Sequence, residues 1–416
     1  MVKNLGDPYP IVRLEHYERY VGAAVVERIL EKARPLQDLR VAHVNSTYYG
    51  GGVAELLSPL TLLMNSVGMV TEWRAIQGPP DFFNITKKMH NALQGADIHL
   101  TPMKANIYEE VVYENAIRNR LDHDRVVIHD PQPLPIVRYS RKRGPWTWRC
   151  HIDLSNPEPA LWEYLKPFVE EYDAMVLSAP EYAQDLRTPQ LFFMPAIDPF
   201  SIKNREMSEA EMDERLQHHH IPTDLPLVVQ ISRFDRWKDP EGVVSAWRLA
   251  RKDAPCTLVL LGNMASDDPE GQEVYQEVMR HRDERIIILS REDTALVNAL
   301  QRRAAVVVQK SLREGFGLTV AEAMWKSTPV IGGNVGGIRH QIEDGYNGFL
   351  VDSVAQCAAR MVQLLKNPKL RRQMGHHAHE TVRRRFLLTR YLEQYLDLFN
   401  AFETHYHLRP LPHLTT

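Results

Sequence analysis

The sequence predicts an α/β protein with two domains, each built on a doubly wound parallel sheet. Short apolar runs rich in β-branched residues alternate with amphipathic helical segments in two successive series, which is typical of parallel strands covered by helices. Between the two series, Pro195–Pro199 is stiff and turn-forming and indicates a hinge. A chain of 416 residues is long enough for two complete hydrophobic cores. We therefore expect an N-terminal domain over residues 1–197 and a C-terminal domain over residues 198–387.

The first domain is predicted to open with amphipathic helices at Leu14–Tyr20 and Ala23–Ala33. A strand, a glycine-rich turn, a helix over Val53–Asn65 and a second strand follow, the beginning of a doubly wound sheet. The mostly polar stretch Gly78–Gly95 is expected to be a long loop that leads into a helix. The strands predicted for this domain are Leu39–Asn45, Val70–Ala75, Arg125–Asp130, Trp146–Asp153, Asp173–Ser178 and Leu191–Met194.

The second domain is predicted to begin with a capping box, Ser208–Glu211, which opens a helix. Asp239 caps a later helix that has proline at its first position and an acid in its first turn. The strands predicted here are Pro226–Ser232, Cys256–Gly262, Arg285–Leu289, Ala304–Gln309, Pro329–Gly332 and Gly348–Val351, and the closing helices are Val354–Leu365, Pro368–Phe386 and Leu388–Phe402.

Composition excludes several classes of function. Charged residues make up 25% of the chain but the net charge is only −3, so neither a nucleic-acid nor a membrane partner is indicated. No apolar run reaches the roughly 18 residues of a membrane span, and we expect no signal peptide. The three cysteines, Cys150, Cys256 and Cys357, are far apart and odd in number, which predicts reduced thiols and a cytoplasmic protein.

The functional prediction depends on the stretch Arg313–Glu322. It joins the predicted strand Ala304–Gln309 to a helix that begins at Leu318. Glycines allow this loop to approach a ligand closely, and the N–H groups at the start of the helix favour an anion. The residues of the loop and helix start that we predict to bind a donor are Gly315, Phe316, Gly317, Leu318 and Thr319.

Two glutamates flank this anion site, Glu314 in the loop and Glu322 in the second turn of the helix. Ionised carboxylates accept hydrogen bonds from hydroxyls, so the pair is explained by a phosphate with sugars on both sides, as in a nucleotide sugar. The alternative is that Glu322 only complements the helix dipole and Glu314 faces water.

Arg233 and Lys238 lie five residues apart between a predicted strand and a helix start. Fixed cations there would stabilise the charge that develops on a departing diphosphate, and each such contact is worth roughly 3–4 kcal/mol. A solvated pair is the alternative, and Arg236 between them is expected to face water. If Arg233 and Lys238 act in this way, no metal is required for the chemistry.

In the first domain, candidate residues follow strand ends, where ligands of open parallel sheets collect. These are Asp130 and His151, with His129 and Asp153 beside them; for each, a loop cap or a structural hydrogen bond is the alternative. The glycine-rich turn places Gly50, Gly51 and Gly52 at a helix start, where Gly51 and Gly52 are predicted to contact the donor. The spacing of these glycines is not that of a dinucleotide-binding fingerprint.

Other chemistries are weaker alternatives. Asp267 and Asp268 could hold Mg²⁺ on a diphosphate, but a surface turn explains them equally well. The histidines at 218–220 and 376–379 are neighbours that do not share a helix face, so we assign them no metal. Glu314 and Glu322 could be read as the carboxylate pair of a retaining glycosidase, which would have no use for the cations.

The glutamate pair, with seven residues between its members and Gly-Phe-Gly among them, resembles the E-x7-E signature of retaining GT-B glycosyltransferases of the glycogen-synthase-like group, glycosyltransferase family 4. The resemblance implies two Rossmann-like domains facing a cleft, the donor mainly on the second and the acceptor on the first. It also implies that Glu314 binds donor-sugar hydroxyls, Glu322 the ribose, His151 the donor sugar and Asp130 the acceptor. The leaving phosphate would deprotonate the acceptor hydroxyl on the front face.

A narrower resemblance covers the whole chain and is carried by the segments His43–Glu55, Phe83–Gly95, His129–Pro133, Trp148–Ser155, Ser232–Asp235, Asp267–Gly271 and Arg313–Thr319. With these segments the chain resembles the trehalose glycosyltransferring synthases. These enzymes move glucose from a nucleotide donor to free glucose and make α,α-trehalose reversibly, so the implied partners are NDP-glucose, glucose and trehalose, with no cofactor. A final helix over about 388–416 is implied to pack back on the first domain, and a homodimer is left open. One departure is Ser327, where members often have glycine after the lysine.

Two alternative functions remain open from the sequence. The same fold could use another acceptor, as in a sucrose-type or phosphorolytic enzyme. The chain could also bind a sugar nucleotide without catalysing a reaction. The base of the donor, UDP-, ADP- or GDP-glucose, is left open.

Overall fold

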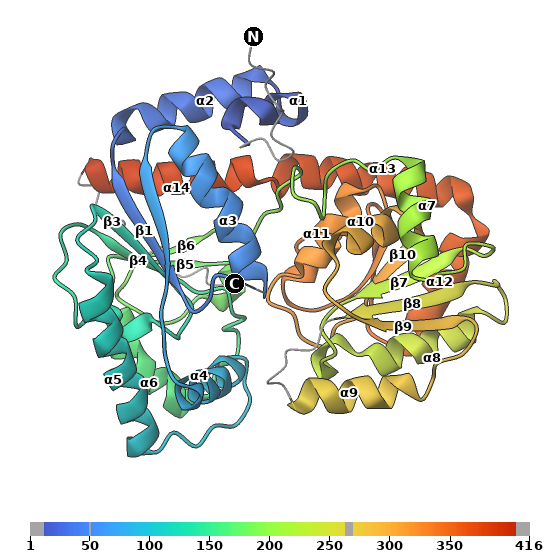
Figure 1. Cartoon of the computed structure of the whole chain (residues 1–416), viewed down its shortest axis with the longest axis horizontal. Helices are drawn as coiled ribbons and strands as arrows, with labels where there is room; N and C mark the ends of the chain where they lie inside the picture. Colours follow the sequence, from blue (N-terminus) through green and yellow to red (C-terminus); the bar gives the residue numbers. More distant parts are fainter. Residues whose placement is uncertain (1–11, 50, 263–268, 405–416) are drawn as a thin grey trace, which may run out of the picture. The chain divides into compact units, whose positions relative to one another are not determined.

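The chain divides into two compact units in a computed structural model that describes residues 12–49, 51–262 and 269–404. Unit 1 comprises Met1–Pro195 together with Leu388–Thr416, and unit 2 comprises Ala196–Leu387. Each unit is built on one six-stranded sheet in which every strand pair is parallel (Figure 1). The prediction of two doubly wound parallel sheets is therefore confirmed.

The sheet of unit 1 has the order β2-β1-β3-β4-β5-β6. Because β1 pairs with both β2 and β3, the strand order reverses at β1, and ligands of such sheets bind beyond the strand ends at this position. The strands are β1 (Arg40–Asn45), β2 (Val70–Ala75), β3 (Arg125–His129), β4 (Trp146–Arg149), β5 (Ala174–Leu177) and β6 (Gln190–Phe192).

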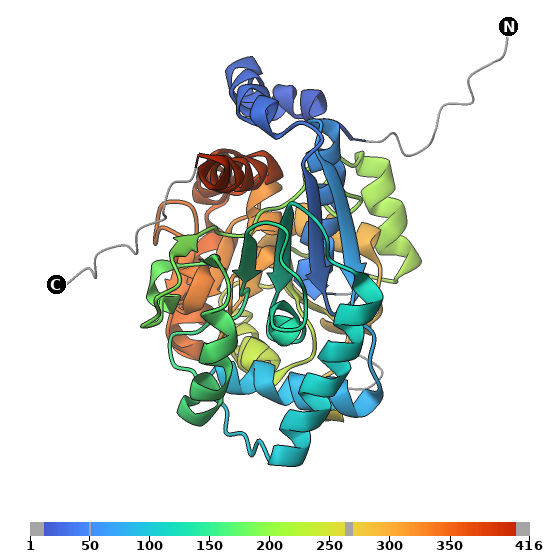
Figure 2. The ribbon, with the colours of Figure 1, turned by 90° about the vertical axis from the view of Figure 1, so that its left-hand side faces the viewer.

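Helices cover this sheet, as Figure 2 shows from the side of unit 1. One prediction was wrong: most of the expected loop Gly78–Gly95 is helix α4 (Pro80–Leu93). Its Phe82, Ile85 and Met89 are buried in the core, and the polar residues that suggested a loop occupy the outer positions of the helix. The other helices are η1 (Leu14–Tyr17), α1 (Glu18–Val21), α2 (Ala23–Ala33), η2 (Arg34–Leu36), α3 (Gly51–Ser66), α5 (Pro102–Asn119), η3 (Leu134–Val137), α6 (Pro159–Val169), η4 (Pro180–Tyr182) and α14 (Leu388–Glu403).

The last helix, α14, completes unit 1 although almost two hundred residues separate it from the rest of that unit. It packs against α2, η2 and α3 (Figure 1). Glu393 pairs with Arg28 at 2.6 Å, and the hydroxyl of Tyr391 accepts a hydrogen bond of 3.1 Å from Nε of the fully buried Arg149. Both contacts join the end of the described chain to residues more than 200 positions earlier in the sequence.

The sheet of unit 2 has the order β12-β11-β10-β7-β8-β9, so its strand order reverses at β7, between β10 and β8. Its strands are β7 (Leu227–Ile231), β8 (Thr257–Gly262), β9 (Ile286–Ser290), β10 (Ala304–Gln309), β11 (Val330–Gly333) and β12 (Phe349–Val351). Its helices are α7 (Glu209–His218), η5 (Arg236–Lys238), α8 (Pro240–Ala250), α9 (Pro269–Met279), α10 (Thr294–Arg303), α11 (Leu318–Trp325), η6 (Gly336–Ile338), α12 (Val354–Lys366) and α13 (Pro368–Arg385).

Candidate functional site

Two loops of unit 2 meet beyond the ends of β7 and β10, the neighbouring strands at which the order reverses. The first loop follows β7 and contains η5; the second follows β10 and leads to α11. The N–H of Leu312 donates to the carbonyl of Trp237 at 2.7 Å, and the guanidinium of Arg313 lies 4.4 Å from the centre of the Trp237 ring. The loops are therefore fixed to one another through backbone and side chain.

The central pair of this site is Lys238 and Glu314. Lys238 Nζ lies 2.5 Å from Glu314 Oε2, and both side chains are largely buried. The hydroxyl of Ser311 also donates to Glu314 Oε2, at 3.4 Å. An ammonium group has three N–H donors, so Lys238 can contact a phosphate while it keeps its bond to Glu314. The structure thus brings together two of the predicted catalytic residues.

A second ion pair, which the sequence analysis missed, joins the same loops. Lys310 Nζ contacts Asp239 Oδ2, and the other carboxylate oxygen of Asp239 caps α8 by accepting from the N–H of Gly242 at 3.1 Å. Asp239 has a φ of 50°, in the left-handed region. The capping role was predicted from Asp-Pro-Glu, but no local pattern indicates the partner Lys310, which lies 71 residues away.

Arg233 is more exposed than the other predicted cations, with 60% of its side chain accessible. Its Nη2 lies 3.4 Å from Asp235 Oδ2, while Asp235 Oδ1 accepts from the N–H of Trp237 at 2.8 Å. Arg236 is also exposed and pairs with Glu277 on α9, so it belongs to the surface, as expected. This contact uses one N–H group of Arg233, and its guanidinium has further donors for a ligand.

Glycines fix the loop before α11. Gly317 has a φ of 84° and is the N-cap of α11, a conformation that residues with a Cβ rarely adopt. A Cβ on Gly337 would lie 2.4 Å from Cα of Phe316, so only glycine allows the turn after β11 to pack against this loop. The amide of Gln341 then donates to the carbonyl of Phe316 at 2.5 Å. The segment with Gly337 and Gln341 therefore holds the loop in place.

The predicted donor-binding residues of this segment differ in exposure. The side chain of Phe316 is buried against Phe386, so it anchors the loop and leaves only its backbone for a ligand. Gly315, Gly317, Leu318 and Thr319 are partly exposed. The first N–H groups of α11 have no intrahelical acceptor, and together with the helix dipole they favour an anion.

Glu322 is almost fully buried in α11, in contrast to the surface alternative. Its Oε1 lies 3.5 Å from Lys203 Nζ. The neighbouring Lys326 is also buried, and burial holds the pKa of its ammonium group well below the usual value. Lys326 donates to Asn204 at 2.7 Å and to Gln301 at 2.8 Å. Glu322 therefore lies in a polar, partly charged part of the interior.

In unit 1, Asp130 and His151 lie beyond the adjacent ends of β3 and β4. Asp130 has a φ of 63°, and its Oδ1 accepts from the N–H of His151 at 2.8 Å. Burial is the main cause that raises the pKa of Asp130 to about 6. The structure thus brings these two predicted residues together, and part of the Asp130 carboxylate is used to fix the turn at His151.

A row of three imidazoles leads from His151 into the core. His151 Nε2 lies 3.0 Å from His129 Nδ1, and His129 Nε2 lies 3.0 Å from His43 Nδ1. Burial lowers the pKa of all three rings, that of His43 to about 3, so the row is neutral at pH 7. Each neutral ring has one N–H, so one nitrogen donates and the other accepts. The nitrogen that carries the proton on the ring at one end therefore determines the donor and the acceptor nitrogen of every other ring in the row.

That end ring is His43, whose buried Nε2 has no hydrogen-bond partner in the described part of the chain. A buried N–H without an acceptor is rarer than an acceptor without a donor, so we assign the proton of His43 to Nδ1. Each ring then donates to the next, and Nδ1 of His151 carries an N–H. The sequence analysis placed His129 and His151 near the site but did not recognise their connection through His43.

The remaining predicted residues have simpler surroundings. Asp153 accepts from the N–H of Ser155 at 2.9 Å and from its hydroxyl at 2.6 Å, which is the loop-cap alternative. Gly51 and Gly52 are exposed at the start of α3, where Gly51 has a φ of 80°. Gly50 lies outside the described residues.

No group of three metal-binding side chains is found in residues 12–49, 51–262 and 269–404. Asp267 and Asp268 lie outside those residues. His219 has protein partners, Asp293 at 3.2 Å and Arg291 at 2.8 Å. No helix in the same part of the chain is long and apolar enough to cross a membrane.

Comparisons with known proteins agree with this geometry. Residues 211–381 match the family "Glycosyl transferases group 1", and residues 43–184 match "Trehalose synthase, N-terminal domain". The structure of sucrose-phosphate synthase from Thermosynechococcus elongatus superposes with a TM-score of 0.68 at 17% identity, over 88% of this chain and 100% of that one. The protein is therefore a glycosyltransferase with the GT-B fold.

The relatives with high sequence identity define a narrower family within these glycosyltransferases. The chain is 43% identical to the trehalose synthase of Thermococcus litoralis over 400 residues, which are 94% of this chain and 97% of that protein. It is 40% identical to the trehalose synthase of Rubrobacter xylanophilus over 400 residues, 93% of this chain and 96% of that protein. The chain belongs to the trehalose synthase family, and the resemblance seen in the sequence is confirmed.

Proposed function

We propose that this protein is a retaining glucosyltransferase that moves glucose from a nucleoside-diphosphate glucose to free glucose and forms α,α-trehalose reversibly. The observation that supports it best is the pair Lys238–Glu314 beside the first N–H groups of α11. It offers, at one point, a cation for phosphate, a carboxylate for sugar hydroxyls and a helix start for anionic charge.

In the proposed reaction the bond between glucose C1 and the β-phosphate oxygen breaks, and the nucleoside diphosphate keeps the electron pair. Lys238, Arg233 and the start of α11 stabilise the charge that develops on this oxygen. The new bond forms between C1 and a hydroxyl of the acceptor glucose on the same face. The proton of that hydroxyl passes to the departing phosphate. Because the new bond forms on the face from which the phosphate leaves, the α configuration is retained.

Unit 1 is proposed to hold the sugars. The row of neutral imidazoles presents an N–H on His151 to a hydroxyl of the donor glucose, and Asp130 accepts from the acceptor. Gly51 and Gly52 at the start of α3 remain proposed donor contacts.

The test is a product assay. UDP-, ADP- and GDP-glucose are each incubated with glucose, fructose or inorganic phosphate, and the product is identified by NMR. We expect α,α-trehalose from glucose and no disaccharide from fructose. A β-linked product, no product with glucose, or a faster reaction with fructose or phosphate would overturn the proposed reaction.

Metal independence is a separate part of the proposal. Since Lys238 and Arg233 supply positive charge at the diphosphate, full activity is expected in excess EDTA. Loss of activity with EDTA and its recovery with Mg²⁺ would contradict this and would direct attention to Asp267 and Asp268.

A further inference from the structure

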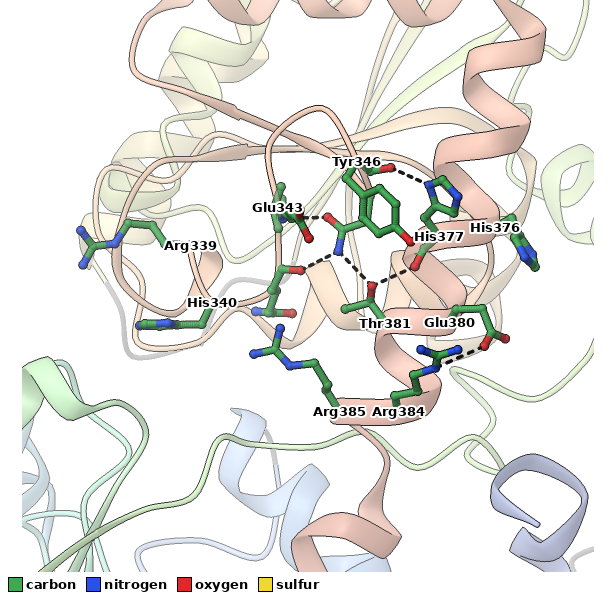
Figure 3. Close-up of a pocket in the computed structure, with 13 residues that line it drawn as sticks. Arg339, His340, Glu343, Tyr346, His376, His377, Glu380, Thr381, Arg384 and Arg385 are labelled. Carbon is green, nitrogen blue, oxygen red and sulfur yellow. Dashed lines mark hydrogen bonds and ion pairs between the residues drawn. The ribbon is translucent and has the colours of Figure 1, made fainter.

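A cavity lies in unit 2, between residues 339–347 and α13 (Figure 3). It is a groove with a volume of ≈ 970 Å³, large enough for a small organic ligand. Residues 343–347 directly precede β12, whereas the loops with Lys238 and Glu314 follow strand ends. In a parallel sheet the starts and the ends of the strands lie at opposite ends of the sheet, so this part of the groove is separate from the loops with Lys238 and Glu314. Residues 339–342, which also line the groove, follow β11 and η6 and form the side nearer those loops.

The lining of this groove is rich in groups that bind anions. Arginines and histidines come from both walls, and Figure 3 shows Arg385 extending from α13 toward the opposite loop. Of the two acidic residues, Glu380 accepts from Arg383 at 2.9 Å, a bond that lowers the pKa of its carboxyl, and Arg384 lies 3.7 Å away. Arg383 thus balances most of the negative charge of Glu380, and the longer contact leaves other N–H groups of Arg384 for a ligand. The second acidic residue of the lining is Glu343.

The walls of the groove are tied together. Nδ1 of His377 donates to the carbonyl of Tyr346 at 3.1 Å, and the two rings stack with centroids 4.0 Å apart and planes at 14°. The amide of Asn347 donates to the hydroxyl of Thr381 at 3.0 Å and to the carbonyl of Gln341 at 3.1 Å. The groove is therefore a formed site with an aromatic face, which distinguishes it from a set of separate surface charges.

We propose that this groove binds a phosphate monoester of a small, polar, ring-containing molecule. Guanidinium groups match phosphate oxygens in pairs, and Arg384 and Arg385 are placed to supply them. The stacked rings of Tyr346 and His377 offer a flat surface for a sugar or base. The phosphorylated molecule can be a sugar phosphate or a nucleoside monophosphate, and the experiment distinguishes these sources.

The groove is connected to the donor loop through Gln341. This residue lines the groove, and its buried side-chain amide donates to the carbonyl of Phe316 at 2.5 Å. The N–H of Gly337, in the same segment, donates to the carbonyl of Glu314 at 3.2 Å. A ligand that shifts this segment would move the loop that carries Glu314. This regulatory role rests on the proposed function; the binding itself does not.

Binding is tested by titration calorimetry on the full chain with inorganic phosphate, glucose 6-phosphate and AMP, each with and without saturating UDP. We expect at least one ester to bind more tightly than phosphate and still to bind at saturating UDP, with its affinity shifted by the coupling but binding not abolished. Arg384→Gln/Arg385→Gln should weaken that binding at least tenfold. The matched variant Arg280→Gln/Arg282→Gln, in the same unit, should leave it unchanged.

Complete exclusion of the ester by UDP, equal binding by both double variants, or binding of inorganic phosphate alone would each overturn the proposed site. Binding of glucose 6-phosphate and not AMP identifies a sugar phosphate, and the reverse identifies a nucleotide.

Coupling is tested by the effect of the bound ester on KM for the donor sugar nucleotide. We expect a change of about fivefold or more in the wild type, and no change in Gln341→Leu although that variant still binds the ester. An unchanged wild-type KM would overturn the coupling. If no transferase activity exists, the calorimetry still decides whether the groove binds, so the two failures are distinguishable.

Discussion

At the scale of single residues, the contact between Lys238 and Glu314 gives the site its character. A lone lysine before a helix, or a lone loop glutamate, has a simple explanation in solvation. The two residues lie 76 positions apart in the sequence, yet their charged atoms are 2.5 Å apart. Both were predicted from their own loops, because each motif follows a strand, but the direct bond between them depends on the pairing of β7 with β10.

Replacing Glu314 with Gln keeps the shape of the side chain and removes its charge. If Glu314 holds donor hydroxyls and orients Lys238, kcat should fall by roughly 10²–10³, the loss typical of a group that stabilises the transition state. Thermal unfolding should change little. Glu214→Gln, an exposed carboxylate of α7, is the control and should retain full activity. Equal turnover by both variants would show that the site is misplaced.

The backbone conformation at Ser327 explains why glycine suits this position in the family pattern. It has a φ of 59°, in the left-handed region that glycine adopts without cost, and family members often have glycine there. We expect Ser327→Gly to increase the free energy of unfolding by about 0.5–1 kcal/mol, measured by urea denaturation. Ser327→Val, with a branched Cβ, should decrease it. A lower stability for the glycine variant would mean that the serine side chain makes a contact worth more than the strain.

Asp130 gives a pH-dependent prediction. Its pKa is raised from 3.8 to about 6 in the folded protein, so the folded state binds the extra proton between these values. Its contribution to stability is therefore most favourable below pH 4 and is lost as the pH rises through 6. Asp130→Asn should gain stability relative to wild type, by on the order of 1 kcal/mol more at pH 8 than at pH 4. Equal differences at both pH values would contradict the raised pKa.

At the scale of elements, the glycine turns decide how closely two loops can pack. Strand and helix positions were predicted well, because β-branched runs and caps are local signals; β2 and β10, for example, have the predicted ends. The contact between the turn at Gly337 and the loop at Phe316 could not be predicted, since a glycine is recognisable but its neighbour is not. Helix α4 was not predicted for a different reason: its polar outer face concealed the amphipathic pattern.

Gly337→Ala tests that packing. Its Cβ would meet Cα of Phe316 at 2.4 Å and the carbonyl of Gly315 at 2.6 Å, both backbone atoms, so the donor loop must shift. We expect a KM for the sugar nucleotide raised at least tenfold in a protein that remains folded by circular dichroism. Gly345→Ala is the control. An alanine at its φ of 78° has a strained backbone, but the added Cβ meets nothing within 4 Å. It should lower stability and leave KM unchanged.

At the scale of the whole molecule, α14 returns to unit 1 and closes its core. The resemblance implied this crossing, but nothing local in residues 388–402 indicates which sheet they cover. The contact that depends on it most is the bond from Arg149 to Tyr391, because Arg149 is fully buried and its guanidinium needs every acceptor.

Tyr391→Phe removes that acceptor and leaves a buried, charged donor unsatisfied. We expect the free energy of unfolding to fall by about 1–3 kcal/mol, with the loss confined to the transition of unit 1 where the two units unfold separately. Chemical denaturation followed by tryptophan fluorescence measures it, since Trp146 and Trp148 lie in the core of unit 1. Tyr113→Phe, half exposed on α5, is the control. A loss below 0.5 kcal/mol would show that Arg149 finds another partner.

The position of α14 at the end of the described chain also has a consequence for biosynthesis. Residues up to Pro195 leave the ribosome without the helix that covers Arg149, and roughly 200 further residues must be translated before it arrives. At about 5–20 residues per second this interval lasts roughly 10–40 s. The second unit, which is continuous in sequence, can therefore reach its native state on the nascent chain before the first does, so the order of maturation is the reverse of the order of synthesis.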